Sequence, residues 1–400
     1  MFRTGDKISL ALAALLILVA LPAGAADFET AMNNFKSGKY VEAAAQFQEF
    51  VDQSPTYDFG YYMLGLSFIQ MGKLDEAEAN FKTALELNPD KFEYHHGLAT
   101  ACFQRKQYDK AIASLRTAEA LATDSGAKYR LYKLRGFSYA GLEKWADAIE
   151  DLENARKIKS SAALLDRLGQ AYYSLGHYDK AAPILREALK EQPDNAADLN
   201  RLANSLINLG AEAKSDAQKD TFYKEALSVA SHYQRTNPGS YEAYNLVGRA
   251  ALGSKDYAKA EKAFETVLEK KPDYCYAMVN LGKVHIALNQ WAEAEAVLKR
   301  GAVCAPRMAV IHESLGFVVQ KQKRLDEAIV HYEAAIKLKP SSSTQQMLET
   351  AQRNLQIQQE NQQMDAEEAR LLAEEQKAKA EYEEEMAKRK EWEERRKRDE

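Results

Sequence analysis

Side chains that could do chemistry are scattered along this 400-residue chain, and no known catalytic arrangement joins them. The phosphate-binding patterns G-x-G-x-x-G and G-x-x-x-x-G-K-[ST] are absent from the sequence, as are H-E-x-x-H and G-x-S-x-G. The adjacent histidines His95 and His96 would point to different sides of a helix, so they are poorly placed to share a metal. We therefore expect no enzyme activity, no cofactor and no metal site.

The three cysteines, Cys102, Cys275 and Cys304, are too few and odd in number for a scaffold built on disulfides. Cys275 and Cys304 would nevertheless meet if the segment between them folds as an antiparallel helical hairpin. One would begin the first helix and the other would end the second. We hypothesise a disulfide between them, and the alternative is two unrelated buried thiols.

The elements that position these residues follow from a repeat with a period of about 34. In 58–91, "DFGYYMLGLSFIQMGKLDEAEANFKTALELNPDK", small and apolar residues recur at helical spacing, break at Gly72, and resume until Pro89. The same layout is found in 162–195 and in 309–342. Each window therefore predicts two amphipathic helices paired as a hairpin.

These windows resemble the tetratricopeptide repeat in their aromatic, Leu-Gly, Tyr, Ala, aromatic, Ala and Pro positions. The resemblance covers nine units, which begin near 24, 58, 92, 129, 162, 196, 241, 275 and 309. It implies an all-α, right-handed superhelical solenoid over residues 26–343, with its concave face lined by the first helix of each unit. The first unit lacks the Leu-Gly pair, and the third has Lys106 where glycine is usual.

Small residues recur at one position on each helix of the repeat and predict close helix packing. We expect both sets to be structural and to have no catalytic role. The first-helix set is Gly65, Gly136, Gly169, Gly248, Gly282 and Gly316, and the second-helix set is Ala77, Ala111, Ala148, Ala181, Ala260, Ala294 and Ala328.

Off this packing stripe, the first helices present residues that could bind a peptide in the concave groove. Arg offers a planar fork to carboxylates, and Asn can pair with a peptide backbone. We therefore hypothesise a groove for an extended or helical segment that carries acidic groups, and the alternative is a solvated polar face. The candidates are Tyr62, Phe103, Phe137, Lys133, Arg167, Asn200, Arg201, Asn204, Arg249, Asn280 and Lys283.

The N-terminus is typical of an exported protein. Arg3 and Lys7 precede the apolar run 8–21, and the small residues 23–25 follow Pro22. This pattern predicts a signal peptide over 1–25 and a periplasmic location, and the alternative is an uncleaved anchor. The net charge of the chain is only −5, so no broad basic surface for nucleic acid is expected.

The stretch "AEAKSDAQKD", within 211–220, interrupts the repeat with an insertion. Because the packing pattern resumes on both sides, we expect no domain boundary here and predict one or two lengthened helices in the sixth unit. The insertion is either a tolerated loop tip or a protruding docking ridge.

Residues 344–400 are predicted to form a helix that first caps the last repeat and then runs on as a solvated, charged helix. Met347, Leu348, Ala351 and Leu355 form the capping stripe. Beyond it, Glu–Lys and Glu–Arg pairs one helical turn apart favour a single helix. A coiled coil is the alternative, with a weak seam of Leu371, Ala378, Tyr382 and Met386.

The sequence thus predicts a non-enzymatic periplasmic scaffold or adaptor that binds proteins or peptides in assembly of an envelope complex. The alternative is a structural protein that oligomerises through its C-terminal helix.

Overall fold

The computed structural model describes residues 25–399, and the fold in this range is built from helices without strands. Residues 1–24 and 400 lie outside the described residues, so the predicted signal peptide falls almost entirely there. Among the described helices, none combines the length and the apolar character needed to cross a membrane.

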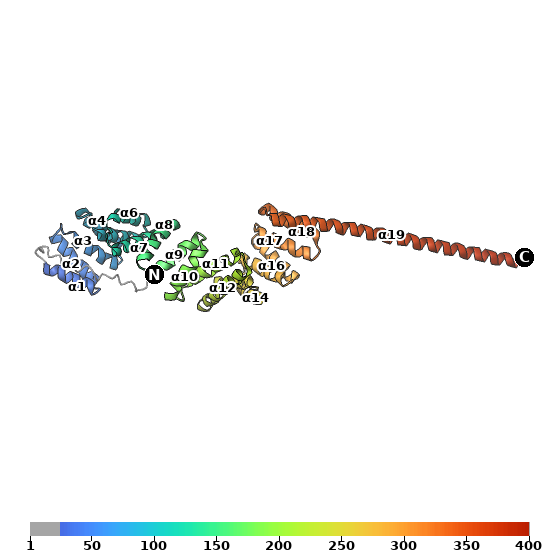
Figure 1. Cartoon of the computed structure of the whole chain (residues 1–400), viewed down its shortest axis with the longest axis horizontal. Helices are drawn as coiled ribbons and strands as arrows, with labels where there is room; N and C mark the ends of the chain where they lie inside the picture. The colour runs from blue at the N-terminus through green and yellow to red at the C-terminus, as the bar shows by residue number, and fades with distance from the viewer. Residues whose placement is uncertain (1–24, 400) are drawn as a thin grey trace. The chain divides into compact units, whose positions relative to one another are not determined.

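The described helices form nine consecutive pairs and one long final helix (Figure 1). Most of the paired helices have nearly the same length, as a regular repeat requires. The pairs are α1 (Ala25–Lys36) with α2 (Tyr40–Gln53), α3 (Asp58–Gln70) with α4 (Leu74–Leu87), α5 (Phe92–Gln104) with α6 (Tyr108–Thr117), α7 (Ser125–Gly141) with α8 (Trp145–Ile158), α9 (Ala162–Ser174) with α10 (Tyr178–Glu191), α11 (Ala196–Glu212) with α12 (Asp216–Thr236), α13 (Tyr241–Gly253) with α14 (Tyr257–Lys270), α15 (Cys275–Ala287) with α16 (Trp291–Cys304), and α17 (Ala309–Lys321) with α18 (Leu325–Leu338), followed by α19 (Ser342–Asp399).

The chain divides into two compact units, 1–209 and 210–400, and the division falls inside α11. The sequence predicted one solenoid over 26–343 with no boundary near 211, and this domain arrangement stays a prediction. Each unit is described below by itself.

In the first unit, aromatic side chains fill the core of the first repeat, which lacks the Leu-Gly pair. Phe28 of α1 packs against Phe47 and Phe50 of α2, with ring centroids 5.3 Å and 4.9 Å apart. Tyr57, which precedes α3, contacts both Phe28 and Phe50. This edge-to-face cluster closes the N-terminal end of the core.

The third repeat departs from the regular pattern at its second helix. Helix α6 has only 10 residues and is followed by the short 3₁₀ helix Glu119–Leu121. Helix α7 then begins at Ser125, ahead of the predicted start of the fourth unit at 129, and Asp124 caps it by accepting a hydrogen bond from the Ala127 N–H at 2.8 Å. The extra residues therefore form an extra turn of helix and a cap.

The glycine position on the first helices sets how closely the two helices of a repeat approach. A Cβ added at Gly169 would lie 2.6 Å from Leu185 Cδ2, and at Gly65 it would lie 2.8 Å from Phe81 Cε1. The other four glycines of the set meet a large side chain at the equivalent position of the second helix, with distances of 2.6–2.9 Å. All seven alanines of the second-helix set are fully buried. The predicted packing role of both sets is confirmed.

The turn inside each repeat needs a residue in the left-handed conformation. Gly38, Gly72 and Gly176 supply it without strain, with φ between +73° and +77°. Five other repeats place a residue with a side chain there, at φ from +57° to +63°: Lys106, Glu143, Lys255, Asn289 and Lys323. Gly72 N donates to Ile69 O at 3.0 Å, and Lys73 N donates to Phe68 O at 2.9 Å, which closes the first helix.

The insertion lengthens both helices of the sixth repeat, as the sequence predicted. Helix α11 has 17 residues and α12 has 21 residues. Within the second unit, Tyr223 of α12 follows the inserted residues, and its ring lies so close to Gly210 and Gly253 that a Cβ at either glycine would clash. The inserted residues 211–220 are exposed, apart from Ala213 and Lys219, which are half-buried.

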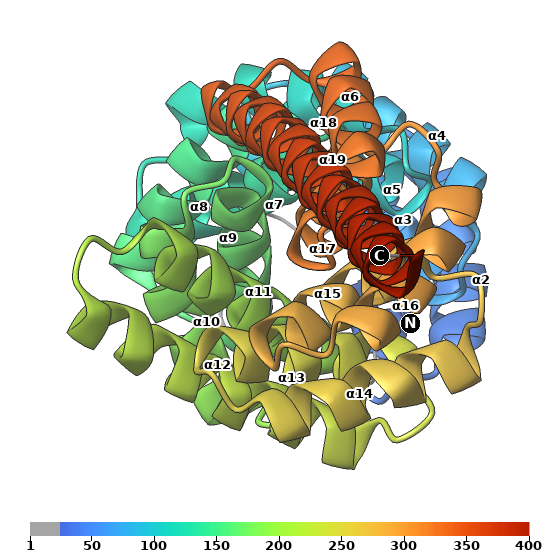
Figure 2. The same ribbon diagram turned by 90° about the vertical axis from the view of Figure 1, so that its right-hand side faces the viewer.

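The last helix, α19, caps the ninth repeat with its first turns and then continues alone (Figure 1), and its C-terminal end faces the viewer in Figure 2. Thr344, Leu348 and Ala351 are buried against the last hairpin, and Leu355 is half-buried. From Gln356 to Asp399 every described side chain is exposed. The predicted capping stripe is confirmed.

Replacing Gly169 with leucine should lower the free energy of unfolding by about 1–3 kcal/mol, because the side chain must displace Leu185. Chemical denaturation followed by circular dichroism measures the change. Gly239→Leu is the control, since nothing lies within 4 Å of a Cβ at Gly239. Equal midpoints for Gly169→Leu and the parent chain would show that this packing is misassigned.

Replacing Lys106 with glycine should stabilise the protein by about 0.5–1 kcal/mol, because glycine adopts a positive φ without the steric cost that lysine bears. The converse change, Gly72→Lys, should destabilise by a similar amount. Thermal unfolding of the two variants should shift in opposite directions. A shift of both in the same direction would contradict the explanation.

Candidate peptide-binding surfaces

The predicted groove residues are divided between the two units. Tyr62, Phe103, Lys133, Phe137, Arg167, Asn200, Arg201 and Asn204 belong to the first unit, whereas Arg249, Asn280 and Lys283 belong to the second. We therefore treat them as two separate surfaces, each carried by the first helices of its own repeats.

The aromatic residues at the N-terminal end of the first surface are engaged in packing. The Tyr62 ring contacts the rings of Phe59, Phe81 and Tyr94 at centroid distances of 5.7, 5.9 and 5.0 Å. Burial, together with the nearby Glu93 carboxylate, raises the pKa of Tyr62 to about 12. Tyr62 was predicted to face a ligand, but it contributes chiefly to the contact between the second and third repeats.

The middle of the first surface combines cations with aromatic rings. Lys133 Nζ on α7 lies 5.7 Å from the Tyr129 ring centroid and 5.8 Å from that of Phe137, one turn to either side. Such a cation–π arrangement holds the ammonium group over apolar surface. Phe103 of α5 is half-buried and contacts Tyr108 at 5.5 Å, so it forms part of the apolar base of its repeat.

Arg167 and Arg201, which occupy equivalent positions one repeat apart, differ in their surroundings. Arg201 Nη1 lies 2.7 Å from Asp166 Oδ1 and 3.1 Å from Asp198 Oδ1. Arg167 is exposed, and its partner in the described chain is the neutral amide of Gln170, at 2.8 Å. Arg201 was predicted to bind acidic groups of a ligand, but its charge is already compensated within the protein.

The acidic partner of Arg201 explains why this arginine is structural. Asp198 is almost fully buried. Burial, and then the neighbouring Asp166 carboxylate, raise the pKa of Asp198 to about 7, while the Arg201 guanidinium opposes that rise. Loss of Arg201 would leave a buried carboxyl group without its cation, which is costly.

The asparagines of α11 in the first unit form a chain of amide hydrogen bonds along the helix. Asn204 Nδ2 donates to Asn200 Oδ1 at 3.0 Å and to Asn200 O at 3.1 Å. Asn208 Nδ2 donates in turn to Asn204 O at 2.9 Å. All three side chains are half-buried, so the row gives this helix a fixed, uncharged polar face.

On the second surface, Arg249 of α13 lies near the phenols of Tyr223 and Tyr274. Burial raises the pKa of both tyrosines, and the positive charge of Arg249 opposes that rise. Asn280 is half-buried and Lys283 is exposed, both on α15. One turn before Arg249, the side-chain oxygen of Asn245 is buried without a hydrogen-bond donor.

A row of tyrosines in the second unit was missed in the sequence analysis. Tyr241, Tyr274 and Tyr276 follow one another with ring centroids 5.3 Å and 5.9 Å apart. Lys271 Nζ lies 4.5 Å from the Tyr241 ring and 5.5 Å from the Tyr274 ring. The available signal was the recurrence of tyrosine where successive first helices begin, at Tyr241 and Tyr274.

Cys275 and Cys304 are joined in a disulfide, with their Cα atoms 5.7 Å apart. The bond links the start of α15 to the end of α16, so it closes the open end of the eighth hairpin. The third cysteine, Cys102, is free and buried. The pairing hypothesised from the sequence is therefore present in the structure.

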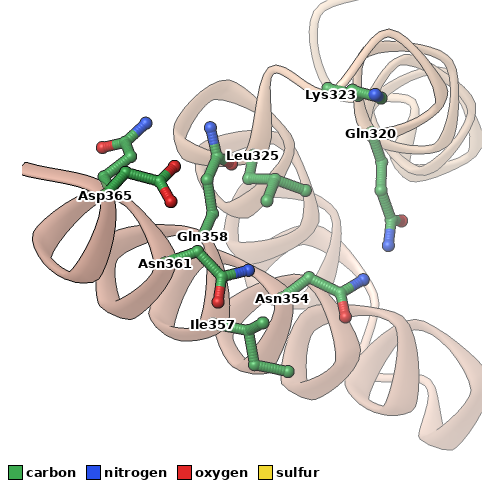
Figure 3. Close-up of a pocket in the computed structure, with 9 residues that line it drawn as sticks. Gln320, Lys323, Leu325, Asn354, Ile357, Gln358, Asn361 and Asp365 are labelled. Carbon is green, nitrogen blue, oxygen red and sulfur yellow. The ribbon is translucent and has the colours of Figure 1, made fainter. Parts of the chain in front are cut away.

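An open hollow lies between the α17–α18 turn and α19 (Figure 3). Lys323 and Leu325 line one side, and the amides of α19 gather opposite them. Its lining residues are Gln320, Lys323, Leu325, Asn354, Ile357, Gln358, Asn361, Gln362 and Asp365. Nothing in it resembles a catalytic site, and no group of three His, Cys, Asp or Glu residues in the described part of the chain is placed to hold a metal.

Comparison with known proteins identifies repeats of one kind along the chain. Family models described as tetratricopeptide repeat match residues 62–126, 215–274, 251–309, 162–195 and 311–342, and together they cover more than half of the sequence.

Individual relatives are distant. The protein O-mannosyl-transferase TMTC1 of Homo sapiens is 23% identical over 230 residues, which cover 48% of this chain and 25% of that protein. The BBSome complex member BBS4 of Bos taurus is 25% identical over 228 residues, which cover 51% of this chain and 44% of that protein. The match thus spans less than half the length of either relative. The C-terminal part of a TPR repeat-containing protein from Cytophaga hutchinsonii aligns with a TM-score of 0.49 at 19% identity, covering 64% of this chain and 99% of that one.

Removing the disulfide with Cys275→Ser and Cys304→Ser should destabilise the eighth repeat by about 3–4 kcal/mol in the chain-entropy picture, because the bond closes a loop of about 30 residues. Hydrogen exchange of α15 and α16 measures the loss. In a reducing buffer the parent and the variant should exchange alike. If their exchange still differs in the reducing buffer, the serines act through packing and not through loss of the disulfide.

Proposed function

Because the chain belongs to the tetratricopeptide repeat family, whose members are typically scaffolds for protein interactions, we propose that it is an exported, non-enzymatic adaptor that binds acidic protein segments through the first-helix surface of its first unit. The observation that carries this proposal is the contrast between Arg167 and Arg201. One arginine is exposed with a neutral partner, and the other is neutralised by two carboxylates.

The chemistry of the surface fits an acidic peptide. Lys133 and Arg167 lie on successive first helices and supply two cations, and Arg167 has no carboxylate within ion-pair distance in the described chain. The half-buried amides of Asn200 and Asn204 follow on the next first helix. An arginine fork can bind a ligand carboxylate with two hydrogen bonds, and an ammonium group held over rings adds a second charge contact.

The proposal of export has two supports. The first is the pattern of residues 1–25, with a basic start, an apolar run and a small-residue cleavage motif. The second is the Cys275–Cys304 disulfide, since structural disulfides form and persist in oxidising compartments. Both the N-terminal pattern and the disulfide are consistent with a periplasmic adaptor that acts in assembly of an envelope complex.

A second candidate function is self-association through α19. The favouring observation is that apolar side chains recur along the exposed part of this helix, among them Met364, Leu371 and Tyr382, which are 55–64% exposed. No part of the described chain covers them.

Replacing Arg167 with glutamate should reduce capture of the bound partner from an envelope extract at least tenfold, because it reverses a ligand-facing charge. Quantitative mass spectrometry of proteins retained by the immobilised chain identifies the partner and measures the loss. Arg300→Glu, an equal charge change at an exposed site on α16, is the matched control and should retain the partner. Equal capture by the parent and the Arg167→Glu chain would exclude this surface.

Arg201→Glu tests the distinction between the two arginines. It should lower the melting temperature, because it adds a third carboxylate beside Asp166 and Asp198. Arg167→Glu should leave the melting temperature unchanged.

A further inference from the structure

The exposed part of α19 has two faces, which differ in how their charged side chains are arranged. On one face, ion pairs form within the helix: Arg370 with Glu367 and Glu374, Lys377 with Glu381, Lys388 with Glu384, and Arg395 with Glu391, at 2.6–3.8 Å. At 3.6 residues per turn these residues share one side of the helix. Two of these ion pairs, Glu384–Lys388 and Glu391–Arg395, have the order that the sequence favours, with the glutamate four residues before the cation.

A second face, about a third of the way around the helix, carries most of the exposed apolar residues. Ile357, Met364, Leu371, Tyr382 and Met386 fall within one stripe at helical spacing, and each is between 45% and 64% exposed. A single exposed apolar residue needs no explanation, but a stripe that runs for about eight turns along a helix with no neighbour does. The partner that covers it must also suit the charges on the same face.

Four of the charges on this face follow a strict heptad centred on Tyr382. Glu368 and Glu375 precede it by two heptads and by one, and Arg389 and Arg396 follow it by one heptad and by two. None of the ion pairs within the described helix involves Glu368, Glu375 or Arg389. Arg396 stacks on the ring of Trp392 at 5.7 Å.

This order of charges fits a second copy of the same helix in only one direction. In a parallel pair, each glutamate would lie opposite the same glutamate and each arginine opposite the same arginine. In an antiparallel pair centred on Tyr382, Glu375 lies level with Arg389 of the second copy, and Glu368 lies level with Arg396. Symmetry then gives four opposite-charge levels in place of four like-charge ones.

We propose that the exposed part of α19 pairs antiparallel with α19 of a second copy of this chain, in the register that places Tyr382 opposite Tyr382. The same register brings Ala378 level with Met386 of the second copy, so that a small side chain faces a large one. The inference rests on the proposed self-association and adds its direction and register. The seam is short and partly charged, so we expect a weak dimer that dissociates on dilution below the micromolar range.

Charge reversal on the seam separates the two directions. Light scattering after size-exclusion chromatography of the full chain, at tens of micromolar and low salt, should give twice the mass of one chain. Glu368→Arg with Glu375→Arg should weaken the dimer at least tenfold. Adding Arg389→Glu and Arg396→Glu to that variant should restore it.

The control for charge reversal is Glu384→Arg with Glu391→Arg, which makes the same charge change on the ion-paired face and removes two ion pairs of the helix. It should remain a dimer, and circular dichroism should show equal helix content in all variants. A parallel pair would respond differently, because the first seam variant only exchanges one like-charge contact for another.

Disulfide trapping in a Cys102→Ala background reads the direction directly. A mixture of chains carrying Ala378→Cys and Met386→Cys should form a crosslinked heterodimer on oxidation, and Ala378→Cys alone should not crosslink. A dimer that crosslinks through Ala378→Cys alone would overturn the antiparallel arrangement and leave self-association standing. A chain that stays monomeric at these concentrations would overturn both the antiparallel arrangement and self-association. The apolar face of α19 would then belong to a different partner.

Discussion

The close approach of two helices inside each repeat is the constraint on which the rest of this protein depends. A glycine on the first helix leaves room for the Phe, Tyr or Leu side chain at the matching position of the second. Phe81 meets both Gly65 of its own repeat and Gly97 of the next, where a Cβ would lie 2.6 Å from its ring, so one ring fixes two contacts. Because this packing fixes the geometry of each hairpin, the faces of the first helices that lie off the packing stripe remain available for binding.

The packing could be predicted from the sequence because it depends on residue size at a fixed spacing. Gly169, Ala181 and the stripe of Leu348 and Ala351 were assigned correctly for this reason. The lengthened α11 and α12 were predictable too, since the inserted residues are good helix formers without proline. The wedge of Tyr223 between Gly210 and Gly253 was not, because the two glycines lie on different helices and only folding brings them to one ring.

The binding surface was harder to predict because charge compensation depends on neighbours in space. Arg167 and Arg201 are equivalent in the repeat, yet only Arg201 has Asp166 and Asp198 beside it. Tyr62 holds a ligand-facing position in the pattern, yet its ring also packs against Tyr94 of the following repeat. The division of the chain within α11 was likewise not visible in a pattern that resumes on both sides. The superhelical course of the whole array stays a prediction.

The disulfide of the eighth hairpin also has a mechanical consequence. The repeats are connected in series, so a pull on the chain ends passes through each hairpin in turn. A force that unravels α15 and α16 would ordinarily release about 30 residues, or roughly 100 Å of extended chain. The bond between Cys275 and Cys304 prevents the release of these residues, because the force crosses the hairpin through the two sulfur atoms. An oxidised chain therefore contains one repeat that cannot lengthen under tension, next to the last hairpin and the helix that extends from it.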